Sequence, residues 1–213
     1  MSFDIICFDC DSTLSKIEGI DELARREGLG AEMARLTNAA MNGEVKLETV
    51  YGQRLSAIRP NKPSIDWLAE AYIAERVDGV EEVFAELLAL GKDVHIVSGG
   101  LRQAILPLAR YLGLPEAQVH AVDVYFNEDG SYQDFDENSP LARNGGKAEI
   151  CRQLLKPDSK LAMVGDGNTD MEAKQAGAYV VGFGGVVDRA IVRELADVYC
   201  QESNLKAVLT HVL

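Results

Sequence analysis

Two aspartates separated by a single residue, Asp9 and Asp11, follow a short apolar run near the N-terminus. Residues 4–8 are predicted to form a buried strand, and the two carboxylates come where that strand ends. In open α/β sheets, ligand-binding and catalytic groups gather at the carboxyl ends of the strands. One acid could attack an electrophile or bind a cation while the other moves protons. The alternative is a simple turn in which Asp11 or Ser12 hydrogen-bonds its own backbone.

Two glycine-containing stretches further along the chain carry groups suited to phosphate. Ser98-Gly99-Gly100 follows a predicted strand and is expected to open a helix, where free amides beside a hydroxyl suit a phosphate oxygen. Lys147 is expected in the first turn of another helix, where the macrodipole disfavours a cation by some tenths of a kcal/mol. A bound phosphate and an attacking carboxylate would compensate that cost. A helix cap at the first stretch and an exposed lysine at the second are the alternatives.

A third stretch, residues 165–170, places two acids after another predicted strand. Its glycines permit a tight turn, and Asp166 and Asp170 are four residues apart. Mg²⁺ prefers a few carboxylates together with waters and phosphate oxygens, and Asp9 and Asp166 at neighbouring strand ends could supply two of them. A Gly-Asp-Gly turn is common by itself. Four acids at two strand ends, with a lysine and Ser-Gly-Gly between them in the sequence, are an uncommon combination.

The elements that must position these groups alternate along most of the chain. Strands are predicted at residues 93–98, 119–121, 161–164 and 179–181, with a hairpin across 124–135 and a closing helix over 205–212. Alternating strands and helices indicate an α/β fold, a Rossmann-like, mostly parallel sheet with helices on both faces. Residues 15–76 interrupt this pattern and are predicted to be entirely helical. We therefore expect a catalytic core of residues 1–14 and 77–213 and a small helical cap domain of residues 15–76, a candidate lid.

The helical insertion contains two charged residues with competing explanations. Arg54 shares a helical face with Leu47 and other apolar residues, so its guanidinium needs a partner. A carboxylate ligand would make a bidentate partner, and an intramolecular Glu would serve as well. Glu18 fits a capping box with Ser15, or it faces a substrate ammonium group.

Composition excludes several classes of partner. The chain has 213 residues and a net charge of −13, a field that repels nucleic acid and anionic membranes. A phosphate site would therefore need local positive charge, such as a metal ion. Residues 1–4 lack the basic start of a secretory signal, and no run is apolar enough to span a bilayer. The cysteines (Cys7, Cys10, Cys151 and Cys200) are interpreted as structural thiols in a reducing cytoplasm. We expect a cytoplasmic monomer or homodimer.

Together, these residues resemble the haloacid dehalogenase superfamily of phosphohydrolases over essentially the whole chain. The motifs that carry the resemblance are Asp9-Cys10-Asp11-Ser12-Thr13, Glu18 to Ala24, Ala40-Met41-x-Gly43, Arg54-Leu55, Ser98-Gly99-Gly100, Gly145-Gly146-Lys147, residues 165–173, and residues 182–185 with Arg189. One departure is Leu47, which stands where the family usually has a phenylalanine pressing on the substrate. The resemblance implies a haloacid dehalogenase-like core with a helical cap.

The resemblance also implies an activity, the hydrolysis of L-phosphoserine to L-serine and phosphate with Mg²⁺, the last step of serine biosynthesis. Asp9 would be the nucleophile that forms an aspartyl-phosphate, and Asp11 the acid and base. Ser98 and Lys147 would act on the phosphate. The metal would be held by Asp9, Asp166 and the Asp11 carbonyl, with Asp170 orienting Lys147 or completing the outer shell. Substrate-binding positions carried over from the family are Glu18 for the ammonium group, Arg54 for the carboxylate, and Met41, Ser98, Gly99, Gly100, Lys147 and Thr169.

Other functions use similar groups. A related phosphatase or phosphotransferase could act on another small phosphomonoester, or pass the phosphoryl group to an alcohol. A receiver-type signalling domain also has clustered acids and a lysine, but it needs an open aspartate. A non-catalytic binding module is disfavoured because every proposed catalytic position carries a competent side chain.

Overall fold

The computed structural model describes residues 2–213, and a parallel sheet forms its centre. Six strands run in the order β3-β2-β1-β6-β7-β8 and are parallel throughout. Their bounds are β1 Ile5–Phe8, β2 Asp93–Leu101, β3 Val119–Val122, β6 Leu161–Gly165, β7 Tyr179–Phe183 and β8 Val198–Cys200. β1 is wholly buried between β2 and β6, as expected for a continuous apolar strand covered on both faces. The α/β prediction is confirmed.

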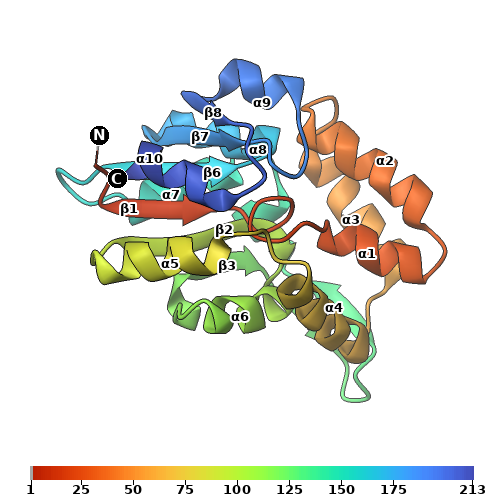
Figure 1. Cartoon of the computed structure of the whole chain (residues 1–213). Helices are drawn as coiled ribbons and strands as arrows, with labels where there is room; N and C mark the ends of the chain where they lie inside the picture. Colours follow the sequence, from red (N-terminus) through yellow and green to blue (C-terminus); the bar gives the residue numbers. More distant parts are fainter. Residues whose placement is uncertain (1) are drawn as a thin grey trace.

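Helices flank this sheet (Figure 1). They are α5 Val80–Ala89, α6 Arg102–Tyr111, α7 Gly146–Leu154, α8 Asn168–Met171, α9 Ala190–Leu195 and α10 Leu209–Val212. Short 3-10 turns complete the set: η1 Glu116–Gln118, η2 Pro140–Ala142, η3 Glu172–Ala176 and η4 Leu205–Val208. The strand β8 and the helix α9 were not predicted from the sequence. None of the helices within residues 2–213 has the length and apolar character that a bilayer span requires.

Four helices separate β1 from α5, in agreement with the helical character expected for residues 15–76. They are α1 Gly19–Arg26, α2 Gly30–Met41, α3 Leu47–Ile58 and α4 Lys62–Ala74, and they lie beyond the carboxyl end of β1 (Figure 1). The two ends of this insertion run side by side. The Lys16 amide donates to the Glu75 carbonyl at 2.7 Å, and the Val77 amide donates to the Leu14 carbonyl at 2.9 Å. The chain therefore leaves the sheet and returns to it at one place.

The predicted hairpin reaches across to the helical insertion. β4 (Val124–Phe126) and β5 (Tyr132–Phe135) pair in antiparallel fashion, and Gly130 takes a φ of +80° in the connecting turn. The Lys62 amide at the start of α4 donates to the Gly130 carbonyl at 2.9 Å. The rings of Phe135 and Tyr51 lie 5.2 Å apart. The hairpin therefore supports α3 and α4 from the side of the core.

One local prediction was wrong, and one alternative considered for Glu18 is not observed. Ser98, Gly99 and Gly100 do not open a helix, because β2 continues through them and α6 begins only at Arg102. Pairing of β2 with β3 resumes after a register shift between Val97 and Leu101, which keeps the chain extended there. The capping box at Ser15 is also absent. Its hydroxyl donates instead to the Glu75 carbonyl at 3.2 Å.

Candidate active site

Asp9 lies directly beyond β1 and faces a lysine. Its Oδ2 is 2.8 Å from the Lys147 Nζ, which is also 2.5 Å from Asp170 Oδ1. All three side chains are buried. Burial alone would lower the pKa of Lys147, but the charges of Asp170 and Asp9 outweigh it and raise that pKa. Lys147 is therefore a fixed cation against Asp9, even though it sits in the first turn of α7.

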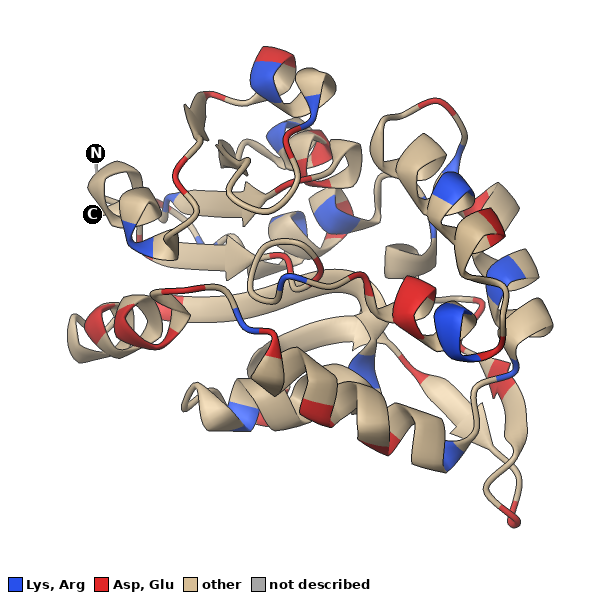
Figure 2. Ribbon diagram, turned by 45° about the vertical axis from the view of Figure 1, so that its right-hand side comes forward, with Lys and Arg blue, Asp and Glu red and all other residues tan. Residues whose placement is uncertain are grey.

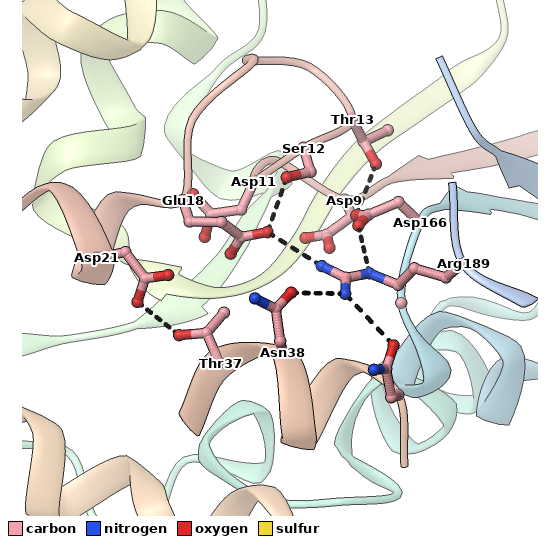
Figure 3. A network of polar contacts seen from close by, with 12 residues as sticks. Asp9, Asp11, Ser12, Thr13, Glu18, Asp21, Thr37, Asn38, Asp166 and Arg189 are labelled. Atoms are coloured by element: carbon pink, nitrogen blue, oxygen red, sulfur yellow. Dashed lines mark hydrogen bonds and ion pairs between the residues drawn. The ribbon is translucent and has the colours of Figure 1, made fainter. Parts of the chain in front are cut away.

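Asp166 follows β6 at the neighbouring strand end. Its Oδ1 accepts from the Thr13 hydroxyl and its Oδ2 from Arg189 Nε, each at 3.3 Å (Figure 3). Burial, reinforced by the charge of Asp9, raises the pKa of Asp166 to about 6. Carboxylate oxygens of Asp9, Asp166 and Asp170 lie within 4.8 Å of one another. Buried acids this close to each other are destabilising unless a positive charge lies between them.

The balance of charges around Asp9, Asp166 and Asp170 indicates whether a divalent cation fits between these acids. Five acids gather here, Asp9, Asp11, Glu18, Asp166 and Asp170, against three buried cations, Lys147, Arg189 and Arg54. The excess of buried negative charge and the oxygen-only donor set both suit Mg²⁺. Asp170 already accepts from Lys147 at Oδ1 and from the Gly167 amide at Oδ2, at 2.9 Å. Asp9 and Asp166 line the cavity whereas Asp170 does not, so those two acids are better placed to bind a metal directly.

Asp11 differs from the other acids because its partners are neutral donors from the helical insertion. Asp11 Oδ1 accepts from the Tyr72 hydroxyl at 2.6 Å and from the Gly19 amide at 2.9 Å. Burial, followed by the charge of Asp9, raises the pKa of Asp11 to about 7, although both hydrogen bonds oppose the shift. Near neutral pH this carboxyl therefore populates both protonation states, which proton transfer in either direction requires.

Glu18 is held over the site by the loop that follows β1. The Ser12 hydroxyl donates to Glu18 Oε1 at 2.7 Å, and Ser12 takes a left-handed φ of +52° to make this turn. Arg189 Nη2 lies 3.8 Å from the same carboxylate. Burial raises the pKa of Glu18, and the charges of nearby acids add to the effect. A ligand ammonium group would offset that accumulation of negative charge.

Arg189 joins the sheet to the helical insertion. Besides Asp166 and Glu18, it contacts α2, where its Nη1 donates to Asn38 Oδ1 at 3.0 Å and to Asn42 Oδ1 at 3.5 Å (Figure 3). Sequence reasoning noted Arg189 as part of a motif but gave it no place in the site. A buried arginine 180 residues from the first acid carries no local periodicity that could show where it reaches.

Arg54 is the buried cation of the helical insertion. It is 3% exposed, and its Nη1 donates to the Thr37 hydroxyl at 2.7 Å, which in turn donates to Asp21 Oδ1 at 2.5 Å. Its Nε is buried without a hydrogen-bond partner. Throughout residues 2–213, no carboxylate lies within 4.0 Å of its guanidinium. The intramolecular Glu considered from the sequence is therefore not its partner.

These groups surround one cavity. It is lined by Asp9, Asp11, Glu18, Ile20, Thr37, Met41, Leu47, Tyr51, Arg54, Ser98, Gly99, Leu141, Arg143, Lys147, Asp166 and Thr169. Among the predicted site residues, Gly100 and Asp170 stand behind this lining. The Gly100 amide donates to the Ser98 Oγ at 3.1 Å, and Asp170 holds Lys147. Thr37 and Tyr51 line the cavity but were not predicted as site residues.

The cavity combines local cations with an acidic chain. Figure 2 shows acidic residues on helices of the insertion and on helices beside the sheet, and the net charge is −13. Lys147 and Arg54 are buried in the lining, so their charges are screened less than exposed ones would be. The fold and the site together define a protein of the parallel α/β class with a cluster of buried acids and a buried lysine at the carboxyl end of its central strands.

Comparison with known proteins shows which family of α/β proteins this chain belongs to. Residues 3–177 match the family described as haloacid dehalogenase-like hydrolase. A phosphoserine phosphatase of Drosophila melanogaster is 40% identical over 198 residues, which cover 92% of this chain and 73% of that one. A substrate-bound phosphoserine phosphatase complex superposes with a TM-score of 0.84 at 26% identity, over 100% of both chains. A phospho-aspartyl intermediate analogue of phosphoserine phosphatase gives a TM-score of 0.81 at 26% identity, also over 100% of both. The chain belongs to the haloacid dehalogenase-like hydrolases and, within them, to the phosphoserine phosphatase family.

Proposed function

We propose that this enzyme hydrolyses L-phosphoserine to L-serine and phosphate through an aspartyl-phosphate at Asp9, with Mg²⁺ as its cofactor. The observation that carries the proposal is Arg54, a buried cation that has no carboxylate partner among residues 2–213 and lines the same cavity as Asp9 and Lys147. An amino-acid phosphate brings a carboxylate for Arg54 and an ammonium group for Glu18. The relatives named phosphoserine phosphatases support the same substrate.

In the first half of the reaction, Asp9 Oδ2 attacks phosphorus and the bond from phosphorus to the serine oxygen breaks. Asp11 gives its proton to that oxygen as it leaves, so serine departs as a neutral alcohol. Lys147, 2.8 Å from Asp9 Oδ2, and the Ser98 hydroxyl hold the phosphate oxygens. Because phosphoryl transfer depends mostly on positioning and electrostatics, these fixed groups supply much of the acceleration.

In the second half, Asp11 takes a proton from the water that attacks the aspartyl-phosphate. Phosphate leaves, and the Asp9 carboxylate is restored. Asp9, Asp166 and the Asp11 carbonyl would hold Mg²⁺, with Asp170 behind them fixing Lys147. When bound, the metal supplies positive charge that offsets the charge of the non-bridging phosphate oxygens.

The remaining predicted residues complete the substrate-binding surface. Met41, on α2, packs against Gly167, where a Cβ would lie 2.8 Å from the Met41 Sδ. Thr169 and Gly99 line the cavity beside it, and Gly100 leaves room for Asp11. We assign residues 15–76 as the cap domain that covers this surface and excludes water during the reaction.

Phosphate release measured with and without Mg²⁺ tests this proposal, across L-phosphoserine, phosphothreonine, sugar phosphates and nucleotides, each with and without an added alcohol acceptor. We expect release that depends on Mg²⁺ and favours L-phosphoserine. Asp9→Asn should abolish turnover while the thermal unfolding curve stays cooperative. Asp134→Asn, the same change at an exposed residue of β5, is the matched control. A near-normal rate in Asp9→Asn would eliminate Asp9 as nucleophile, and preferred release from a sugar phosphate would overturn the substrate assignment.

A further inference from the structure

Tyr72 contacts the proposed acid of the reaction, although it lies in the last turns of α4 and does not line the cavity. It is fully buried, and its hydroxyl donates to Asp11 Oδ1 across a separation of 61 residues. Gly19 of the helical insertion lies against its hydroxyl group. A buried tyrosine at a helical spacing is ordinarily a core residue, but its hydroxyl needs a partner. Here that partner is a carboxyl group placed to transfer protons.

The two oxygens of the Asp11 carboxyl differ in their hydrogen bonds, because both donors are bound to Oδ1. The Tyr72 hydroxyl and the Gly19 amide occupy Oδ1 at 2.6 and 2.9 Å, which uses both acceptor positions of that oxygen. Oδ2 lies on the other side, 3.1 Å from where a Cβ on Gly100 would stand. Oδ2 is therefore the oxygen that can carry a proton while the Tyr72 hydroxyl and the Gly19 amide both keep donating to Asp11.

Residue 19 has no room for a side chain, because the Tyr72 hydroxyl lies against it. A Cβ at Gly19 would lie 2.0 Å from the Tyr72 hydroxyl oxygen and 2.8 Å from its Cζ. The backbone of Gly19 is at the start of an ordinary helix and does not have a positive φ, so neighbouring side chains exclude a side chain there, above all Tyr72 and to a lesser degree Leu68, whose Cδ2 would lie 3.2 Å away. The absence of a side chain at residue 19 allows both its own amide and the Tyr72 hydroxyl to reach one oxygen of Asp11.

We propose that Tyr72 is a positioning residue that fixes Asp11 with Oδ2 toward the leaving oxygen of the substrate. The inference rests on the proposed function, in which Asp11 Oδ2 gives its proton to the serine oxygen as the bond to phosphorus breaks. Without Tyr72, Asp11 keeps the Gly19 hydrogen bond but is free to turn, so its proton is less often in line with that oxygen. Because α4 belongs to the helical insertion, the acid is positioned by the part of the chain that covers the site.

The test compares substrates whose leaving groups differ in their need for a proton. An alkoxide such as that of phosphoserine or phosphoethanolamine leaves only if it is protonated, whereas p-nitrophenolate leaves without a proton. Single-turnover release of the alcohol or phenol, followed by rapid quench, isolates the first half of the reaction. Tyr72→Phe should slow release from phosphoserine and phosphoethanolamine about 10-fold or more, and p-nitrophenol release by less than about 2-fold. A purely structural loss would slow all three alike.

Two further variants keep this test decisive. Tyr51→Phe is the matched control, because Tyr51 is also buried on a cap helix but its hydroxyl donates to the Gly99 carbonyl at 2.7 Å, so any loss should be equal for both leaving groups. Gly19→Ala should reproduce the leaving-group dependence by displacing the Tyr72 hydroxyl. Equal slowing of alkyl and aryl substrates, or no slowing, in Tyr72→Phe overturns the positioning role. If wild type does not hydrolyse phosphoserine at all, it is the proposed function that fails.

Discussion

Replacing Arg54 by alanine is the sharpest test of substrate recognition. Arg54 Nη1 is occupied by Thr37, while its Nε is buried and unpartnered, so a bound carboxylate would gain at least one charge-assisted hydrogen bond. Such bonds contribute about 1.5–3 kcal/mol each, and truncation also leaves the ligand carboxylate without a counter-charge. A loss of about 3 kcal/mol corresponds to roughly a 100-fold fall in kcat/KM for phosphoserine.

The assay compares kcat/KM for phosphoserine and p-nitrophenyl phosphate, which has no carboxylate. Arg54→Ala should lose most of its activity on phosphoserine and little on the aryl phosphate. Arg54→Lys should fall between, because it keeps the charge but loses the planar fork. Arg59→Ala removes an exposed arginine just beyond the same helix and should behave as wild type. Equal losses on both substrates in Arg54→Ala would show that Arg54 does not bind the carboxylate.

Two pH dependences follow from the structure. The first-turnover release of serine should fall about tenfold per pH unit above about 7. Burial and the charge of Asp9 raise the pKa of Asp11 to about 7, and only the protonated form of Asp11 can donate a proton to the leaving oxygen. A rate of serine release that does not change across that pH range would contradict this. Burial and the nearby His95 lower the pKa of His120 to about 4, so the unfolded chain binds more protons from there up to about pH 6.5. The contribution of His120 to the free energy of unfolding should therefore decrease as the pH falls through that window, by about 1–2 kcal/mol after allowance for solvent screening, while buried acids with a raised pKa, such as Asp11 and Asp166, contribute in the opposite direction. Denaturant titrations of wild type and His120→Asn isolate this contribution: the stability of wild type relative to His120→Asn should decrease as the pH falls from about 6.5 to about 4, and a difference that does not change with pH would refute it.

The sheet and its catalytic edge were predictable because their signals are local. Residues 5–8 form a continuous apolar run, and parallel strands must bring their carboxyl ends to one edge. This alone gathers Asp9 and Asp166, whose strands β1 and β6 are neighbours. Lys147 follows from the same rule, since its helix begins beside that edge. The strand β8 is only three residues long, too short for alternation to stand out.

The contacts made by the helical insertion were not predictable in this way. Helical periodicity places Tyr72 and Arg54 on apolar faces, and both are buried as expected. Periodicity cannot show that the hydroxyl of Tyr72 meets Asp11, or that the guanidinium of Arg54 meets Thr37. Those contacts depend on how four helices pack over the sheet. The helix start predicted at Gly99 and Gly100 was wrong for a similar reason. Pairing of β2 with β3 keeps these two glycines extended, although glycines are typical of turns.

The division of the site between two parts of the chain has a consequence for specificity. Asp9, Asp166 and Lys147 belong to the sheet edge. The donors that hold Asp11, on α1 and α4, belong to the same helical insertion as α3, which carries Arg54. In the proposed function, a substrate carboxylate bound to Arg54 would stabilise the helices over the site and, with them, the orientation of Asp11. Binding energy from a part of the substrate that does not react is thereby used in the transition state. A phosphate ester without the carboxylate should then lose kcat as well as affinity.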